Sequence, residues 1–185
     1  MSGKSYLSIY AKSFSWAGFF LPRETLKKCS VLYDFCRVAD NIADDKDEIE
    51  VKEKKFAEFE NDFNQKKFDN LIIKNMWGIM EEFNISIKIV QDLLAGIKSD
   101  IKEKVEISSK KELLIYSYRV AGTVGLMMAK ILNVTKKNSL KSAIDLGIAM
   151  QLTNISRDVI EDSKNNRFYI EENFEKISST INLAN

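Results

Sequence analysis

The sequence predicts an all-α protein, and three observations carry this prediction. Only one proline, Pro22, occurs in 185 residues, and proline is the residue that interrupts helices most strongly. Leu, Ile, Lys and Glu recur at helical spacing along most of the chain. Apolar residues make up 45% of the sequence, enough for one domain with a substantial core. We therefore expect a single domain, 1–185, built from long helices.

The elements follow in order from start and stop signals. Pro22 suits the first position of a helix, and Ser109 with Glu112 matches a capping box at the start of another. Polar clusters at 64–70 and 165–166 are typical of helix ends. The tail from Phe168 follows no clear pattern. The expected helices are 5–18, 22–45, 50–65, 71–82, 85–103, 109–133 and 137–165.

Composition excludes several classes of function. The chain has no histidine, which removes Ser-His-Asp and Cys-His catalysis and histidine metal sites. Its 28 basic and 27 acidic residues nearly cancel, so no net field favours nucleic acid as a partner. We expect carboxylates, Lys, Arg and aromatic side chains to do any chemistry.

The sequence also bounds the cellular setting. Cys29 and Cys36 are seven residues apart on one expected helix, about 10 Å along its axis, which is too far for a disulfide. Reduced core thiols are consistent with a cytoplasmic location. No apolar run reaches the roughly 18 residues of a transmembrane segment. Peripheral contact with a membrane stays open.

An acidic pair lies on one face of the expected helix 22–45. Projected at about 100° per residue, an arc of about 60° contains Tyr33, Arg37, Asp40 and Asp44. The other side of the helix carries an apolar stripe, expected to face the core, of Val31, Phe35, Val38 and Ile42.

A second acidic pair lies on the expected helix 137–165. An arc of about 80° contains Gln151, Asn154, Asp158 and Asp162. It borders the expected core stripe of Ile144, Ile148, Leu152, Ile155 and Val159. Polar residues at the edge of a buried face indicate a polar cavity inside a helical bundle.

The chemistry of these pairs points to a cation. Like charges four residues apart destabilise a helix, and acids near a helix C-terminus oppose its dipole. Oxygen ligands without histidine favour Mg²⁺, which often bridges carboxylates and phosphates. Arg37 and Arg157 lie beside the pairs and suit phosphate binding. The alternatives are solvated surface acids and salt bridges within each helix.

Two glycines stand inside the expected helix 109–133. Gly122 and Gly125 each cost about 1 kcal/mol relative to alanine in a helix interior. They indicate either close packing of a neighbouring helix or room for a ligand.

Four segments of the sequence resemble the squalene/phytoene synthase family, the head-to-head prenyl transferases. They are AKSFSWAGFFLP (11–22), LYDFCRVADNIADD (32–45), YSYRVAGTVGLMM (116–128) and QLTNISRDVIEDSKNNRFYI (151–170). The resemblance implies an isoprenoid-synthase-type helical bundle around a central cavity. It also implies that Asp40, Asp44, Asp158 and Asp162 hold Mg²⁺, or Mn²⁺, that binds the diphosphates of two prenyl substrates.

The resemblance also implies a set of substrate-binding residues. Besides the arginines at 37 and 157, these are Ser13, Phe14, Tyr33, Tyr116, Gln151, Asn154, Arg167 and Tyr169. For the aromatic residues the alternative is core packing, for Ser13 a helix cap, and for Gln151 and Asn154 buried hydrogen bonding to backbone.

Two questions follow from the resemblance. Family members continue well beyond the second acidic motif, so we expect 185 residues to be about the N-terminal two-thirds of a longer protein without the C-terminal helices. Phytoene made from geranylgeranyl diphosphate is the expected product. The alternatives are dehydrosqualene, hydroxysqualene or squalene made from farnesyl diphosphate, and only squalene requires NADPH.

Other classes of protein are kept as alternatives. A non-catalytic helical assembly protein could share the fold, although such proteins typically lose acidic residues of the motifs. A terpene cyclase or head-to-tail prenyl transferase is expected to carry Asp-Asp-x-x-Asp, whereas this chain has Asp-Asn-Ile-Ala-Asp at 40–44.

Overall fold

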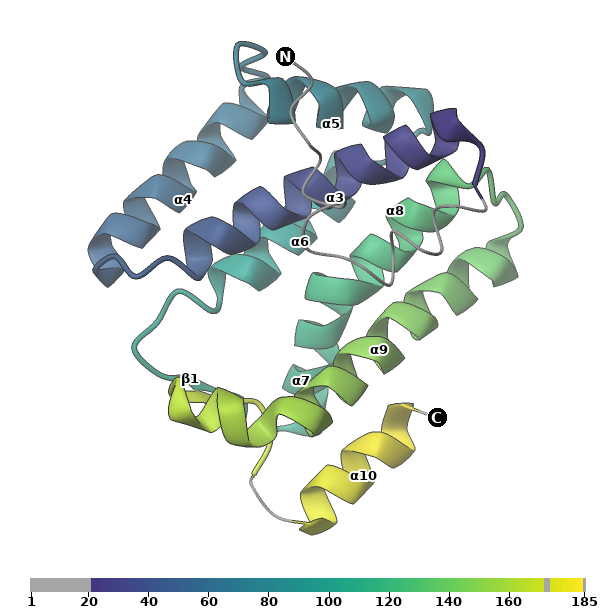
Figure 1. Cartoon of the computed structure of the whole chain (residues 1–185). Helices are drawn as coiled ribbons and strands as arrows, with labels where there is room; N and C mark the ends of the chain where they lie inside the picture. The colour runs from purple at the N-terminus through teal and green to yellow at the C-terminus, as the bar shows by residue number, and fades with distance from the viewer. Residues whose placement is uncertain (1–20, 172–173, 185) are drawn as a thin grey trace. The chain divides into compact units, whose positions relative to one another are not determined.

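The computed structural model describes residues 21–171 and 174–184, and these residues are almost entirely helical (Figure 1). The all-α prediction is confirmed. The expected helix 5–18 lies outside the described residues. The elements, in order, are α3 (Arg23–Ala43), α4 (Ile49–Asn64), α5 (Leu71–Glu82), α6 (Ile87–Lys98), β1 (Val105–Glu106), α7 (Lys110–Ser117), the π-helical η1 (Tyr118–Gly122), α8 (Thr123–Ile131), α9 (Lys137–Lys164), β2 (Arg167–Phe168) and α10 (Phe174–Ala184).

The chain divides into two compact units. The first contains the described residues up to Ile87 together with Met127–Val134, and the second contains Lys88–Leu126 and the described residues from Thr135 onward. The extent of the prenyl-synthase domain, 1–185, stays a prediction.

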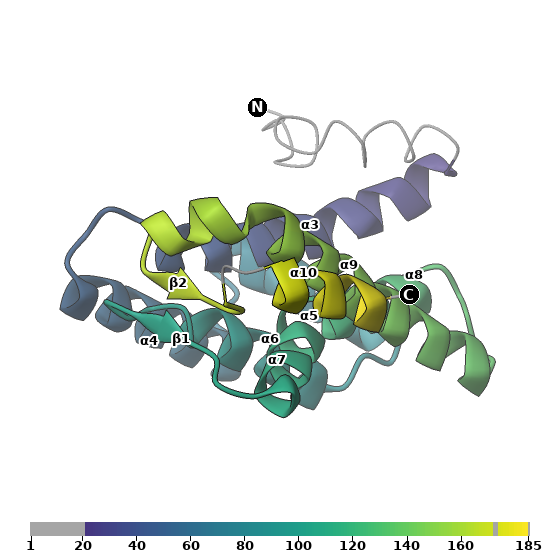
Figure 2. The same cartoon turned by 90° about the horizontal axis from the view of Figure 1, so that it is seen from below.

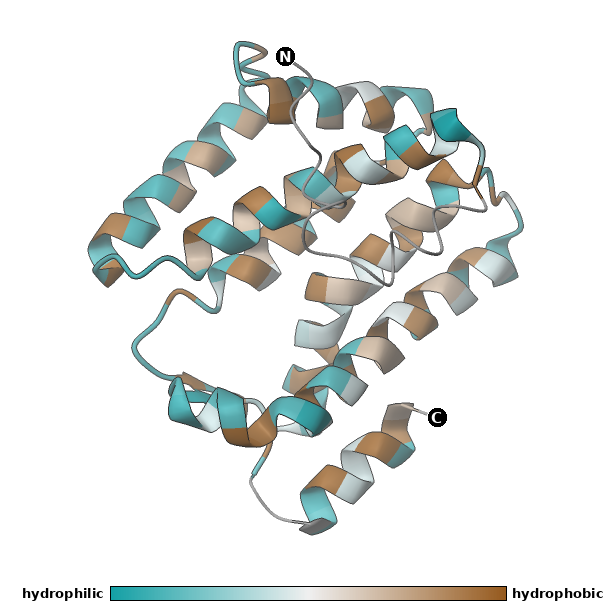
Figure 3. Ribbon diagram, in the orientation of Figure 1, coloured by the Kyte–Doolittle hydropathy of each residue, from teal (hydrophilic) through white to brown (hydrophobic). Residues whose placement is uncertain are grey.

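In the first unit, α3 packs against α4 and α5 around an aromatic core (Figure 1). The ring of Phe35 lies 5.4 Å from the rings of both Phe59 and Phe63, and Phe63 stacks on Trp77 at 5.3 Å. The Trp77 indole donates a hydrogen bond to the Phe63 carbonyl, so its polar atom is satisfied. Figure 3 shows apolar and polar positions interleaved along α4, as a helix with one buried face requires.

The predicted apolar stripe of α3 was wrong in its direction. Of the four residues Val31, Phe35, Val38 and Ile42, only Phe35 is buried. The buried face instead contains Cys29, Leu32, Phe35, Ala39 and Ala43. Two of these residues are alanines, which hydropathy alone ranks below valine and isoleucine, so the pattern of the sequence favoured the wrong face. Both cysteines are free thiols, as expected.

The second unit is built around α9. The predicted stripe is confirmed in its centre, where Leu152, Ile155 and Val159 are buried, while Ile144 and Ile148 are half-buried. The core cluster joins Val105, Leu113, Tyr116, Leu152, Ile155 and Tyr169. Figure 2 shows β1 beside β2, and α10 beside α9.

Glycines set how closely η1 and α8 approach α9. A Cβ at Gly125 would lie against the carbonyl oxygen of Ala143, and a Cβ at Gly147 would lie against that of Ala121. At both positions an added Cβ would overlap the carbonyl oxygen, so only glycine fits. At Gly122 a Cβ would meet Tyr118 at 3.1 Å and Ile144 at 3.2 Å. Close helix packing therefore accounts for Gly122 and Gly125.

Two predicted helices differ from the structure. The segment 109–133 is not one regular helix, because η1 interrupts it with a Thr123 N–H that bonds to the Tyr118 carbonyl, five residues back. The segment 85–103 ends early, at Lys98, and leads through a turn into β1. Ser109 does cap α7, accepting from the Glu112 N–H at 3.2 Å.

Within residues 21–171 and 174–184, the structure contains no helix with the length and hydropathy needed to cross a bilayer.

Candidate functional site: two acidic motifs

The first acidic motif lies in the last two turns of α3. Asp40 is half-buried, and Asp44 is exposed and follows the last residue of the helix. Tyr33 and Arg37 are half-buried on the preceding turns. The helix therefore presents the predicted residues along one face, from its middle to its C-terminal end.

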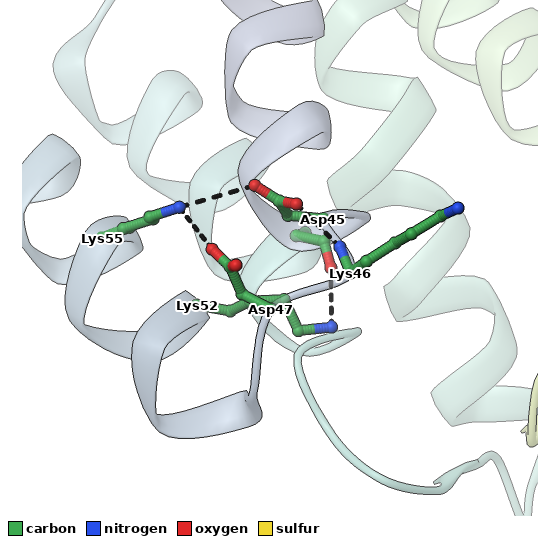
Figure 4. Close-up of polar contacts among 6 residues, drawn as sticks. Asp45, Lys46, Asp47, Lys52 and Lys55 are labelled. Atoms are coloured by element: carbon green, nitrogen blue, oxygen red, sulfur yellow. Dashed lines mark hydrogen bonds and ion pairs between the residues drawn. The ribbon is translucent and has the colours of Figure 1, made fainter.

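Two lysines of α4 contact the chain around the end of α3, and one of them pairs with acids that follow this motif (Figure 4). Lys55 forms ion pairs with both Asp45, at 3.5 Å, and Asp47. Lys52 donates to the carbonyl of Ala43 at 3.2 Å, which satisfies a carbonyl at the end of α3. The lysine-rich segment 52–55 thus ties α4 to the acidic end of α3. Asp45 is held by this structural contact, outside the motif.

The second acidic motif lies on α9 and carries its own cation. The Arg157 guanidinium makes two parallel hydrogen bonds to Asp158, from Nε to Oδ1 at 2.6 Å and from Nη2 to Oδ2 at 2.5 Å. This bond lowers the pKa of Asp158 below its ordinary value. Both groups face solvent, with side-chain exposures of 67% and 33%, so the pair is accessible and contributes little to stability.

The pKa of Asp162, one turn further on, is shifted in the opposite direction to that of Asp158. Burial is the main cause that raises the pKa of this carboxyl, and the charge of Asp158 raises it further. The charge of Arg167 on β2 acts in the opposite direction and lowers it. Asp158 and Asp162 therefore repel each other across one helical turn, and a cation between them would relieve the repulsion.

A divalent cation fits this donor set only if a ligand completes the coordination. Among the residues that the structure describes, no group of three or more acidic, cysteine or histidine side chains is placed to hold a metal ion. Mg²⁺ is commonly held by one or two carboxylates together with phosphate oxygens. The carboxylate pair of α9 fits that arrangement, with hard oxygen donors and mutual repulsion.

The remaining predicted residues lie in several places. Tyr116 and Tyr169 are buried, with exposures of 9% and 6%, and their rings stack at 4.9 Å. Their hydroxyl groups both bond to Asp100, a residue that the sequence reasoning missed. Gln151 is half-buried and Asn154 is exposed. Ser13 and Phe14 lie outside the described residues.

A signal for Asp100 was present in the sequence. A carboxylate near the C-terminal end of a helix is unfavourable for the helix dipole, and Asp100 follows α6 by two residues. The expected range 85–103 placed Asp100 inside a helix, which concealed its position in a turn.

Comparison with known proteins gives one consistent answer. The squalene/phytoene synthase family model matches residues 7–173. A 15-cis-phytoene synthase of Pantoea ananas is 30% identical over 176 residues, covering 89% of this chain and 57% of that enzyme. Phytoene synthase 1 of Solanum lycopersicum, a chloroplastic protein, is 31% identical over 171 residues, covering 87% of this chain and 41% of that enzyme.

A solved structure gives the same result for the fold. A dehydrosqualene synthase crystallised with a ligand has a TM-score of 0.69 and 30% identity, over 90% of this chain and 58% of that one. The chain thus spans less than two thirds of the length of each of these relatives.

Proposed function

Because the chain belongs to the squalene/phytoene synthase family, we propose that the whole protein condenses two prenyl diphosphates head to head. The observation that carries this proposal is the pair of Asp-x-x-x-Asp motifs, at 40–44 and 158–162, each accompanied by an arginine. Acids paired at one turn, with guanidinium groups beside them, are suited to binding diphosphate together with a divalent cation.

The carboxylates of Asp40, Asp44, Asp158 and Asp162 would hold Mg²⁺ or Mn²⁺. When bound, such an ion stabilises the negative charge that develops on a departing diphosphate. Arg157 is held on Asp158 in the ligand-free protein and is exposed, so it can turn to diphosphate oxygens once a cation takes that carboxylate. Arg37 and Arg167 would add charge at the same groups.

The reaction starts when the C–O bond of one substrate breaks and both electrons leave with the diphosphate. The double bond of the second prenyl chain attacks the resulting allylic cation, and loss of a proton gives a cyclopropylcarbinyl diphosphate. A second ionisation, rearrangement and proton loss give a linear hydrocarbon. Aromatic faces such as those of Phe14 and Tyr33 would stabilise the cations without trapping them.

Phytoene formed from geranylgeranyl diphosphate is the proposed product, because the curated relatives named above are phytoene synthases. Dehydrosqualene formed from farnesyl diphosphate is the second candidate, because the solved structure is of a dehydrosqualene synthase. NADPH belongs to the proposal only for squalene. Because the proposed product is an apolar hydrocarbon, its release into a membrane is expected. We therefore propose a cytoplasmic protein with peripheral membrane association.

The test is to incubate the intact protein with Mg²⁺ and either geranylgeranyl or farnesyl diphosphate, without NADPH, and to analyse the hydrocarbons. We expect phytoene from the first substrate. If only farnesyl diphosphate reacts, and it gives dehydrosqualene, then dehydrosqualene replaces phytoene as the proposed product. No hydrocarbon from either substrate, together with no Mg²⁺-dependent binding of the diphosphates, would contradict the proposal and favour the non-catalytic assembly protein.

A further inference from the structure

Three oxygen-bearing side chains form a cluster in the second unit, in which Tyr116 and Tyr169 are buried and Asp100 is half-buried. The hydroxyl of Tyr116 donates to Oδ2 of Asp100 at 2.7 Å, and the hydroxyl of Tyr169 donates to Oδ1 at 3.0 Å. The two hydroxyl oxygens are 3.1 Å apart. One carboxylate thus accepts hydrogen bonds from two residues that lie 16 and 69 positions further along the chain.

The bonding pattern fixes where the two phenol hydrogens point. An ionised carboxylate has no hydrogen to donate, so both phenols must donate to it. Burial raises the pKa of Tyr116 and of Tyr169, and the charge of Asp100 raises both further, so both phenols keep their hydrogens. Replacing Asp100 would leave two buried donors without their acceptor, which is costly.

Close packing holds Asp100 in place. A Cβ at Gly96, near the end of α6, would lie 2.7 Å from the Cβ of Arg119 and 2.9 Å from Val120, so α6 lies directly against η1. The turn after α6 is closed by the Ser99 and Asp100 N–H groups, which donate to Gly96 and Ile97. Asp100 is therefore a fixed point to which other segments can be tied.

The hydrogen bond of Tyr169 ties the segment that carries Arg167 to Asp100. After α9 the chain turns at Asn166, whose φ is 56°, and enters β2, parallel to β1. The N–H groups of Val105 and Ile107 bond to the carbonyls of Asn166 and Phe168 at 2.9 and 3.0 Å. Arg167 lies between these two bonds, and two residues later the chain is tied to Asp100.

Arg167 also lies at the end of the turn that follows the acidic motif. The Asn165 N–H donates to the Asp162 carbonyl at 2.9 Å, and the Asn166 N–H donates to the Ser163 carbonyl at 3.1 Å. A chain of contacts therefore runs from Asp100 through Tyr169 and β2 to Arg167, and this turn joins β2 to the end of α9. Each contact lies within the second unit.

We propose that Asp100 is a positioning residue of the reaction: by holding the hydroxyls of Tyr116 and Tyr169, it fixes β2 so that Arg167, at the end of the turn that follows α9, engages substrate diphosphate. This inference rests on the proposed function. Asp100 acts through Arg167 and contacts no reacting atom.

The test is a double-mutant cycle in the intact protein. Asp100→Asn keeps the shape of the side chain but can no longer accept from both phenols, and we expect KM for prenyl diphosphate to rise about tenfold with a smaller change in kcat. Arg167→Gln is expected to raise KM as well. In the Arg167→Gln background, Asp100→Asn should then have little further effect.

The matched control is Asp92→Asn, which removes a half-buried acid of α6 that pairs with Lys88. It should leave KM unchanged. If Asp100→Asn folds poorly, Tyr169→Phe removes one of the two bonds and should give a smaller rise in KM with the same dependence on Arg167.

Additive effects of Asp100→Asn and Arg167→Gln, or an unchanged KM in Asp100→Asn, would overturn the proposal. The cycle is repeated with inorganic pyrophosphate and Mg²⁺, with binding measured by calorimetry. Coupling in pyrophosphate binding, in a protein that makes no hydrocarbon, would support the positioning role while refuting the proposed function. Hydrocarbon formation without coupling would do the reverse.

Discussion

The acids near the two motifs pair with cations of different origin. At the end of α3, Lys55 from a second helix pairs with Asp45 and Asp47, which lie outside the motif. On α9, the cation is Arg157, and it pairs with a residue of the motif itself, Asp158. The first arrangement is a structural tie between helices, and the second is a contact that an incoming ligand must break.

This difference indicates which charges serve the fold and which serve a ligand. A cation contributed by a neighbouring helix fixes two elements together. A cation on the adjacent residue fixes nothing beyond its own helix, and the exposure of Arg157 leaves it ready to move. We therefore expect substitutions at the two motifs to differ in their balance of stability and activity.

The largest effect is expected for Asp158→Asn. The variant should stay folded, because Asp158 is only partly buried, while hydrocarbon formation falls about 100- to 1,000-fold. The control is Asp145→Asn, which changes an exposed acid on the same helix. Turnover of Asp158→Asn equal to that of the control would contradict a role for this carboxylate.

Two glycine substitutions, one in each unit, test how tightly the helices pack at those positions. Gly147→Ala places a methyl group against the carbonyl of Ala121, and we expect the free energy of unfolding to fall by about 1 to 3 kcal/mol. Gly78→Ala on α5 meets nothing within 4 Å and should raise that free energy by about 0.5 to 1 kcal/mol. Denaturant titration measures both, and equal effects would contradict the close packing of α9.

Lys55→Met tests the structural tie at α3. We expect the free energy of unfolding to fall slightly at low salt and less at high salt, and turnover to change less than about fivefold. Lys54→Met removes an exposed neighbouring lysine and is the control. A loss of turnover as large as that of Asp158→Asn would place Lys55 in the reaction and remove the distinction between the motifs.

The smallest effect is expected for the stability of Asp162→Asn without metal. Because the folded protein raises the pKa of Asp162, ionising this group opposes folding at neutral pH, and the variant should be more stable by a few tenths of a kcal/mol. The gain should vanish as the pH falls through the raised pKa, where the wild-type carboxyl is protonated. Thermal unfolding against pH measures it, and a less stable variant at neutral pH would contradict this sign.

The sequence predicted α9 well because the helix is long and its apolar spacing is regular. The range 137–165 is close to Lys137–Lys164, and Leu152, Ile155 and Val159 are buried as expected. The acids of this helix were also expected to border the buried face, and Asp158 and Asp162 are both half-buried. Periodicity is a local property and needs no knowledge of the partner helix.

The errors fall where tertiary contacts decide. The buried face of α3 includes Ala39 and Ala43, whose burial depends on the helices packed around α3 and not on their own hydropathy. The helix predicted at 109–133 is broken by the π-helical η1. The helix predicted at 85–103 ends early where the chain leads to β1, which pairs with the distant β2. Asp100 was missed because its partners, Tyr116 and Tyr169, are brought to it only by folding. Metal and substrate binding by the predicted residues stay predictions.

The most direct measurement of the central claim is calorimetric binding of inorganic pyrophosphate to the intact protein, with and without Mg²⁺, in wild type, Asp40→Asn and Asp158→Asn. If the carboxylates of each motif bind diphosphate through divalent ions, binding requires Mg²⁺ and each substitution weakens it at least about tenfold. Binding that is independent of Mg²⁺, or unchanged in either variant, would contradict this account.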